Sequence, residues 1–234
     1  MCTVTFLPLG DRNFVLTSNR DVGYKRAKAE PPHETVEEGV TLLYPKDGKA
    51  GGTWIGSSRD NRLICLLNGG FENHVQQESY RKSRGLIVKE ILIAEDLEDI
   101  LLTIDLDGIE PFTLVIVEWS EELRLSQFVW DGVKRFNQDL DLAPRIWSSS
   151  TLFDPEMRQT RNNWFETWKE TKPHNPLTLL EFHKNAGAGN NEVGVILKRE
   201  RVGTVSITQF VKQGKTQMTY QEIPLPEKPD LVVE

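Results

Sequence analysis

The chain has 234 residues, of which 38% are hydrophobic and 27% charged, and its formal net charge is −7 at pH 7. This length suits one sizeable domain with a buried core, and the negative charge argues against a nucleic-acid-binding protein. No apolar run is long enough to span a membrane. Because the chain has only two cysteines and shows no secretory signal, we expect no disulfide framework and a cytoplasmic location.

The chain begins with a predicted β-hairpin. Residues 3–7 are rich in strand-forming side chains, residues 10–13 form a turn signal, and residues 14–17 are typical of a second strand. Since such a turn lays the second strand beside the first, we expect the polar run Asn19-Arg20-Asp21 to lie near Cys2. An arginine and a carboxylate there could orient an α-amino group and lower the pKa of a thiol.

Cys2 directly follows the initiator methionine, which is an unusual place for a cysteine. Methionine aminopeptidase removes Met1 when the next side chain is small, and the product carries a thiol and a free α-amine on one residue. The amine can then act as the base for the thiol, as it does for an N-terminal threonine nucleophile. The other interpretation of Cys2 is a small buried hydrophobic side chain.

The remaining pattern predicts an α+β fold. Residues 22–39 are charged and contain prolines, which indicates a long surface loop. Apolar runs predict strands at 40–44, 53–56, 62–67, 112–118, 123–130, 133–137, 145–149, 193–198, 203–211 and 217–222. Apolar periodicity and capping residues predict helices at 79–92, 96–103, 155–169 and 176–184. Consecutive strands favour antiparallel sheets flanked by helices, and close packing against a sheet would explain Gly85 inside a helix.

Two further polar residues follow the strand at residues 62–67. Asn68 closes that strand before two glycines, where its amide could stabilise a developing oxyanion or cap the turn. His74 lies in the loop beyond, where it could contact a substrate or only solvent. The histidines show no metal-ligand spacing, so we expect no metal and no cofactor.

Several of these motifs resemble the NRDE family, whose eukaryotic members are like transport and Golgi organisation protein 2. The resemblance rests on Met-Cys-Thr-x-x-Phe at the start, Asn19-Arg20-Asp21, Gly51-Gly52-Thr53-Trp54-Ile55-Gly56, Leu66-Leu67-Asn68-Gly69-Gly70, Ser83-Arg84-Gly85-Leu86 and Phe112-Thr113-Leu114-Val115. The N-terminal part is also similar to the choloylglycine hydrolase and penicillin V acylase group of N-terminal-nucleophile (Ntn) hydrolases, which place an aspartate at the spacing of Asp21 from a cysteine at position 2.

This resemblance implies a four-layer αββα sandwich, with one domain at residues 1–223 and a tail at 224–234. It implies a small-molecule substrate or ligand and leaves the oligomeric state open. By the same resemblance the catalytic residues are Cys2, Asp21, Arg20 and Asn68, and the substrate-binding residues are Asn19, Ser149, Ser150 and His74.

The chain departs from these families at three positions. Val22 stands where the family name has a glutamate, and Ser18 stands where the acylases usually carry an arginine. Ser150 replaces an asparagine that would resemble the oxyanion donor of the acylases. Two hypotheses therefore stand: an N-terminal cysteine amidohydrolase that cleaves a non-peptide C–N amide bond, or a non-catalytic protein that binds or carries a lipid, acyl-CoA or haem in the same pocket. Haem binding would need an axial ligand such as Cys2 or a histidine.

Overall fold

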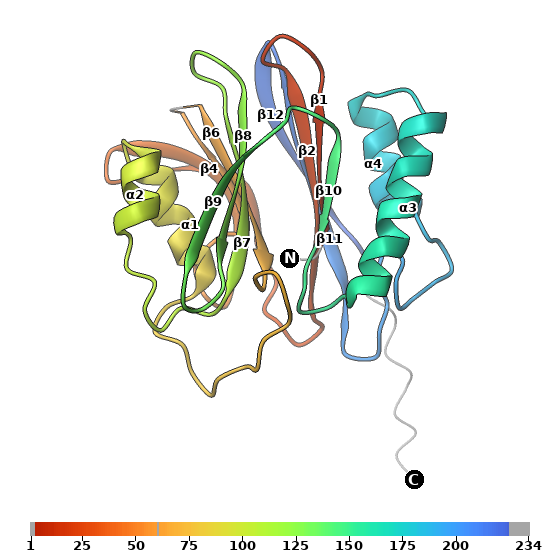
Figure 1. The fold of residues 1–234 in the computed structure, drawn as a ribbon, viewed down its shortest axis with the longest axis horizontal. Helices are drawn as coiled ribbons and strands as arrows, with labels where there is room; N and C mark the ends of the chain where they lie inside the picture. Colours follow the sequence, from red (N-terminus) through yellow and green to blue (C-terminus); the bar gives the residue numbers. More distant parts are fainter. Residues whose placement is uncertain (1–2, 60, 225–234) are drawn as a thin grey trace.

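The computed structural model describes residues 3–59 and 61–224 and shows two antiparallel β-sheets packed face to face (Figure 1). The five-stranded sheet has the order β10 (Arg145–Ser148), β1 (Thr3–Pro8), β2 (Phe14–Gly23), β11 (Val202–Gln213) and β12 (Lys215–Glu222). The seven-stranded sheet has the order β3 (Glu30–Glu37), β4 (Val40–Lys46), β5 (Ile55–Ser58), β6 (Arg62–Asn68), β7 (Phe112–Glu118), β8 (Arg124–Trp130) and β9 (Arg135–Leu140).

Helices cover the outer face of each sheet (Figure 1). The seven-stranded sheet carries α1 (Arg84–Ile93) and α2 (Leu97–Thr103), and the five-stranded sheet carries α3 (Pro155–Thr171) and α4 (Pro176–Asn185). The last two begin at the predicted signals, because Asp154 and Asn175 cap them with side-chain hydrogen bonds and a proline follows each cap. The predicted αββα sandwich is thus confirmed. None of the described helices is long and apolar enough to cross a membrane.

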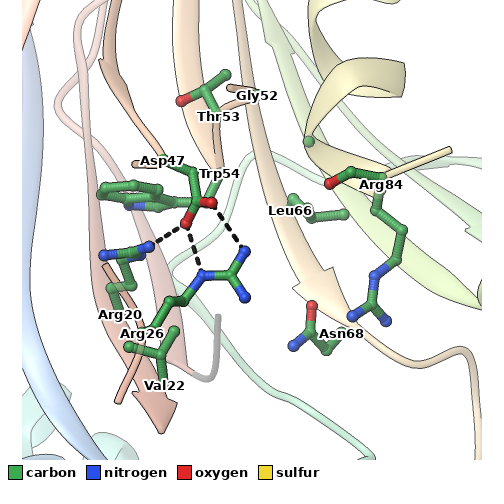
Figure 2. Close-up of a pocket in the computed structure, with 12 residues that line it drawn as sticks. Arg20, Val22, Arg26, Asp47, Gly52, Thr53, Trp54, Leu66, Asn68 and Arg84 are labelled. Atoms are coloured by element: carbon green, nitrogen blue, oxygen red, sulfur yellow. Dashed lines mark hydrogen bonds and ion pairs between the residues drawn. The ribbon is translucent and has the colours of Figure 1, made fainter. Parts of the chain in front are cut away.

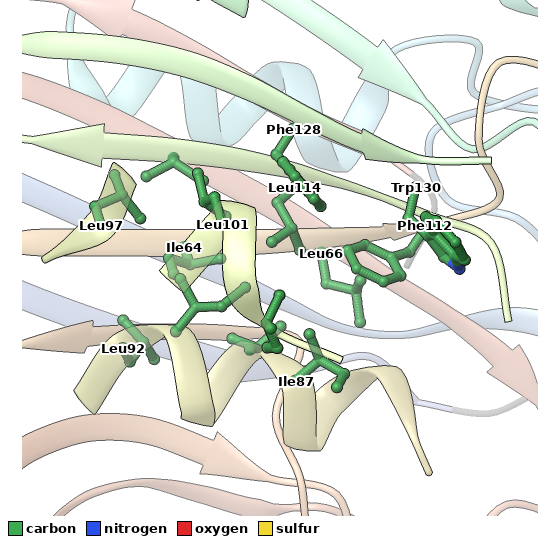
Figure 3. Packing of buried hydrophobic residues seen from close by; sticks show 14 of the residues in the cluster. Ile64, Leu66, Ile87, Leu92, Leu97, Leu101, Phe112, Leu114, Phe128 and Trp130 are labelled. Carbon is green, nitrogen blue, oxygen red and sulfur yellow. The ribbon is translucent and has the colours of Figure 1, made fainter. Parts of the chain in front are cut away.

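Three apolar layers hold the sandwich together. The layer between the sheets contains the aromatic side chains Phe6, Phe14, Trp54, Trp119 and Phe210, together with aliphatic residues of β6 and β7. Another layer fills the space between the seven-stranded sheet and its two helices (Figure 3). The third joins the five-stranded sheet to α3 and α4. Side chains alternate between the two faces of a strand, and because both faces are covered at β6 and β7, the sequences of these two strands are apolar almost without interruption.

The predicted hairpin of β1 and β2 is confirmed, and it is longer than the sequence suggested. Thr3 pairs with Asn19, and β2 continues through the polar run to Gly23. On its other edge Thr3 pairs with Ser148 of β10. The start of β1 is therefore held between two strands of the five-stranded sheet.

Three sequence predictions are wrong in detail. Residues 22–39 are not one loop, because β2 extends to Gly23 and β3 pairs with β4 as an edge strand whose side chains are mostly exposed and polar. The first helix begins at Arg84, and residues 79–83 precede it. The segment 193–198 makes only one isolated bridge, from Lys198 to Gly203, because Arg161 takes the carbonyls of Val193 and Gly194.

The unusual glycine of α1 has the predicted explanation. Thr53 N–H donates to the Gly85 carbonyl at 3.1 Å, so the helix begins in direct contact with the chain just before β5. A Cβ atom on Gly85 would lie 2.8 Å from the Thr53 carbonyl oxygen, which is too close for any side chain. The predicted tail at 224–234, apart from Pro224, lies outside the described residues.

Candidate active site

Cys2 lies outside the described residues, so the site is described from its chain neighbour Thr3. Thr3 is fully buried, and its hydroxyl accepts a hydrogen bond from the Arg161 guanidinium. Arg161 is itself fully buried, stacks on the Phe153 ring and also donates to the carbonyls of Val193 and Gly194. These contacts fix the start of β1 against the chain that precedes β11.

A cavity of about 100 Å³ opens where the two sheets meet (Figure 2). One wall carries Arg20 from β2 together with Arg26, Asp47 and Trp54. The opposite wall is formed by the end of β6 and the start of α1, and its lining residues include Leu66, Asn68, Ser83, Arg84 and Gly85. The cavity thus brings together two residues predicted for the site, Arg20 and Asn68.

The first wall is built on a carboxylate shared by two arginines. Arg20 donates to Asp47 Oδ2, and Arg26 donates from Nε to Oδ2 at 2.7 Å and from Nη2 to Oδ1 at 2.8 Å. Burial alone would raise the pKa of Asp47, but hydrogen bonds from Arg26 and the Ala50 N–H and the charge of both arginines lower it to about 2. Burial lowers the pKa of Arg20, and Asp47 offsets part of that effect. Arg20 also stacks over Trp54, 4.1 Å from the ring centroid.

The opposite wall holds Asn68 through its backbone. Ser149 Oγ donates to the Asn68 carbonyl oxygen at 2.6 Å, which leaves the side-chain amide facing the cavity (Figure 2). Ser149 is buried and serves as a support for this strand end. Ser150 points away to the loop beyond β6, where its hydroxyl donates to the Glu72 carbonyl at 3.1 Å.

His74 is connected to the same wall only through Glu110 and Arg84. Its Nε2 lies 3.3 Å from Glu110 Oε1, and the other oxygen of Glu110 lies 2.9 Å from Arg84 Nη2. Arg84 lines the cavity and also donates to the Pro111 carbonyl. The histidine is therefore connected to the cavity through an ion pair and does not line it.

The polar run of β2 divides between the two faces of its sheet. Because side chains alternate along a strand, Arg20 enters the cavity while Asn19 and Asp21 lie on the helix-facing side. Asn19 is fully buried; its amide donates to the carbonyls of His183 and Val195 and accepts from the His183 ring. Asp21 accepts a hydrogen bond of 2.5 Å from the Thr204 hydroxyl. The structure thus separates Asn19 from the cavity in which Arg20 lies.

Sequence reasoning did not single out Arg26, Asp47, Trp54 or Arg84. Trp54 and Arg84 lie within motifs that carry the family resemblance, so that signal was available. Arg26 and Asp47 lie in irregular segments that only the folded chain brings together.

The fold is that of the Ntn hydrolases. The structure is similar to the Caenorhabditis elegans ortholog of N-acylethanolamine-hydrolyzing acid amidase, with a TM-score of 0.57, 11% identity and coverage of 90% of this chain and 92% of that chain. It is also similar to penicillin V acylase from Agrobacterium tumefaciens, with a TM-score of 0.51, 10% identity and coverage of 95% of this chain and 86% of that chain.

A search of curated proteins finds no match to this chain. The family model described as Transport and Golgi organisation 2 matches residues 1–186, which is most of the 234 residues. The matched part includes both walls of the cavity and the four helices found among the described residues. The chain therefore belongs to the Transport and Golgi organisation 2 family.

Proposed function

We propose that this protein is an N-terminal cysteine amidohydrolase that cleaves a non-peptide C–N amide bond. The observation that carries the proposal is the cavity that Arg20 lines from β2, the strand that pairs with β1. Thr3, which is bonded to Cys2, lies between Asn19 and Ser148, and the next residue of β2, Arg20, lines a cavity that Asn68 shares. The Ntn-hydrolase fold supports the same conclusion, because such folds use the first residue of the mature chain as the nucleophile.

The reaction takes two steps after Met1 is removed. In the first, the Cys2 thiol attacks the amide carbonyl carbon, and its α-amine takes the thiol proton and passes it to the leaving nitrogen as the C–N bond breaks. In the second, water attacks the thioester, and the acid leaves as the thiol is restored. Asp21 is the proposed partner of the α-amine, and the Asn68 amide is the proposed donor to the oxyanion. Arg20 orients the substrate from the cavity wall.

Ser149 and Ser150 were predicted to bind the substrate, but in the structure both hydroxyls donate to backbone carbonyls. Ser149 holds the Asn68 carbonyl, so we propose that it positions the oxyanion donor without touching the substrate. Ser150, which replaces the asparagine of the acylases, is held by the Glu72 carbonyl. Asn68 and a backbone N–H therefore carry oxyanion stabilisation in the proposed mechanism.

A binding protein without catalysis is the second candidate, and it would use a second cavity beside the first. A neighbouring cavity of about 390 Å³ shares Arg20, Val22 and Arg26 with the first, and its apolar lining includes Ala29 and Tyr220. Such a cavity accepts an acyl chain, whether that chain belongs to a substrate or to a cargo.

The test compares Cys2→Ala with the unmodified chain on a panel of N-acyl amides. The matched control is Cys65→Ala, which removes the other thiol, a fully buried one. The proposal predicts that Cys2→Ala abolishes turnover and keeps ligand binding, whereas Cys65→Ala retains turnover. Equal turnover by Cys2→Ala and the unmodified chain would refute the nucleophile. Binding of an acyl ligand with no turnover of any amide by the unmodified chain would select the binding protein.

A further inference from the structure

The edge strand β9 presents its outer side to solvent. It is the outermost strand of the seven-stranded sheet, and β8 is the only strand in the described part of the chain that pairs with it (Figure 1). Every residue of β9 except Leu140 is exposed. An edge of this kind is a template for another strand, because its backbone N–H and C=O groups are already arranged for pairing.

The other edges of the two described sheets carry features that hinder such pairing. β3 contains Pro31 and Pro32, which have no backbone N–H, and a bulge interrupts its register. β10 has only four residues. β12 begins with a lysine, and Lys28 pairs with Glu222 at its other end at 2.9 Å. β9 has no proline, no lysine and no bulge, so it lacks these common protections of an edge.

Exposed apolar side chains gather at the same edge. The Phe136 ring of β9 is 41% exposed and meets the Phe71 ring at 5.0 Å between centroids. Val133, in the turn before β9, and Leu142, just after β9, are also exposed. These are four of the eight large hydrophobic side chains found exposed among the described residues, and such a concentration marks an interaction surface.

The pairing of β8 with β9 fixes which residues direct their backbone groups outward. Asp131 N–H donates to the Lys134 carbonyl at 3.2 Å, so these two residues form a hydrogen-bonded pair where the hairpin turns. Hydrogen-bonded and non-hydrogen-bonded pairs alternate along an antiparallel ladder, so every second residue from Lys134 onward bonds to β8. The residues between them direct N–H and C=O away from β8, and they are Arg135, Asn137 and Asp139.

We propose that β9 pairs antiparallel with β9 of a second copy of this chain, about a two-fold axis at Asn137. In this register the three outward-directed residues pair with one another, and Arg135 of each copy lies opposite Asp139 of the other. Opposite charges directly across an antiparallel pair stabilise it. Phe136 lies opposite Gln138 and is the diagonal neighbour of Phe136 in the other copy, within reach of an aromatic ring. The pairing is independent of the proposed function, because no residue of β9 lines the cavity.

The order of charges along β9 selects this partner and this register. A two-fold interface requires a surface that is complementary to itself, and one β9 strand supplies both charges. An axis at Arg135 or at Asp139 would place like charges opposite each other, which is unfavourable. An axis at Phe136 or at Gln138 would leave Asp139 opposite an uncharged residue. The Asp139 side chain is 72% exposed, so a second copy can reach it despite its ion pair with Arg124 at 3.5 Å.

Sedimentation equilibrium of the untagged full chain over a dilution series tests the dimer. We expect a mass of twice the 26.8 kDa of one chain at high concentration, which falls to one chain on dilution. Asp139→Arg should weaken the dimer by about tenfold or more, because two attractive pairs become repulsive. Arg135→Asp/Asp139→Arg exchanges the two charges and should restore the dimer. The control Glu34→Arg makes the same change of charge on the exposed strand β3 and should leave the dimer unchanged.

A disulfide at the two-fold axis tests the register without a change of charge. In the Cys2→Ala background, Asn137→Cys places each thiol opposite its equivalent, where the Cα atoms of a hydrogen-bonded pair lie about 5.5 Å apart, within the range of a disulfide. Oxidised glutathione should therefore convert most of this variant to a covalent dimer. The control Val133→Cys carries an exposed thiol far from its equivalent in the second copy and should stay without a cross-link.

Four results would overturn the proposal. One is the mass of a single chain at every concentration. Another is a dimer that Asp139→Arg leaves intact, and a third is equal weakening by Glu34→Arg, which would mean that net charge alone sets the association. The last is a failure of Asn137→Cys to cross-link faster than Val133→Cys. This comparison decides the question even if the variant with exchanged charges does not fold.

Discussion

A buried histidine makes the stability of this protein depend on pH in a calculable way. His183 is fully buried between α4 and the five-stranded sheet. The Asn19 amide nitrogen donates to two carbonyls, so its Oδ1 accepts from His183 Nδ1 at 2.5 Å, and Nε2 is left to accept from the Thr5 hydroxyl at 2.7 Å. The ring is therefore held neutral. Burial, with a smaller contribution from the Arg161 charge, lowers the pKa of His183 from 6.5 to about 3.

This shift destabilises the folded state in acid. Below pH 6.5 the unfolded chain binds a proton at His183, whereas the folded chain binds that proton only near pH 3 and below. The stability contribution is thus fully present above pH 6.5 and is lost between pH 6.5 and 3, by about 1.4 kcal/mol for each pH unit. Between pH 7 and pH 4.5 the loss from this group is about 2–3 kcal/mol, a large part of the stability of an ordinary domain.

Urea unfolding of the unmodified chain and of His183→Gln at pH 7 and 4.5 measures this loss. The glutamine does not titrate, so the unmodified chain should lose about 2–3 kcal/mol more than the variant over this range. His174→Gln, which replaces an exposed histidine, is the control and should follow the unmodified chain. Parallel losses in the unmodified chain and His183→Gln would refute the reasoning. If the variant does not fold, an NMR titration of the His183 ring decides, and protonation above pH 5 would contradict the account.

Three further predictions concern packing and reactivity. Gly85→Ala should destabilise by roughly 1–3 kcal/mol in urea unfolding because its Cβ would meet the Thr53 backbone, whereas Gly23→Ala, whose nearest contact is 3.6 Å, should cost less than about 1 kcal/mol; equal costs would contradict this. Burial raises the pKa of Cys65 to about 12, so Ellman's reagent should label it in Cys2→Ala only after unfolding, and labelling of the folded protein would refute its burial. Arg161→Met should destabilise by at least about 1–3 kcal/mol, since it removes the donor to the Thr3 hydroxyl and to the carbonyls of Val193 and Gly194, and a loss below about 1 kcal/mol would show that these acceptors find other partners.

The sequence predicts elements where local signals agree. Apolar runs mark β6, β7 and β8 because both faces of these strands are covered, and a cap followed by proline marks the start of α3 and α4. The edge strand β3 escaped prediction because one face meets solvent and its prolines and charges are typical of a loop. Its pairing with β4 decides its conformation, and no local signal carries that information.

The site is harder to predict because it depends on which face of a strand each residue occupies. Asn19, Arg20 and Asp21 form one polar cluster in the sequence, yet alternation along β2 sends only Arg20 into the cavity. Asn19 bonds to His183 and Asp21 bonds to Thr204, both more than 150 positions away, so no spacing rule could reveal these contacts. Asp47, the centre of the charged cluster, lies in a turn and gave no signal of its own.

The most direct test of the central claim is the intact mass of the 234-residue chain, expressed without a tag ahead of Met1. A nucleophile that carries its own base requires a free α-amine on Cys2. The account therefore predicts a mass lower by one methionine residue, with Cys2 at the N-terminus. A mass that retains Met1 on most molecules would contradict the amidohydrolase and leave the binding protein as the function of this cavity.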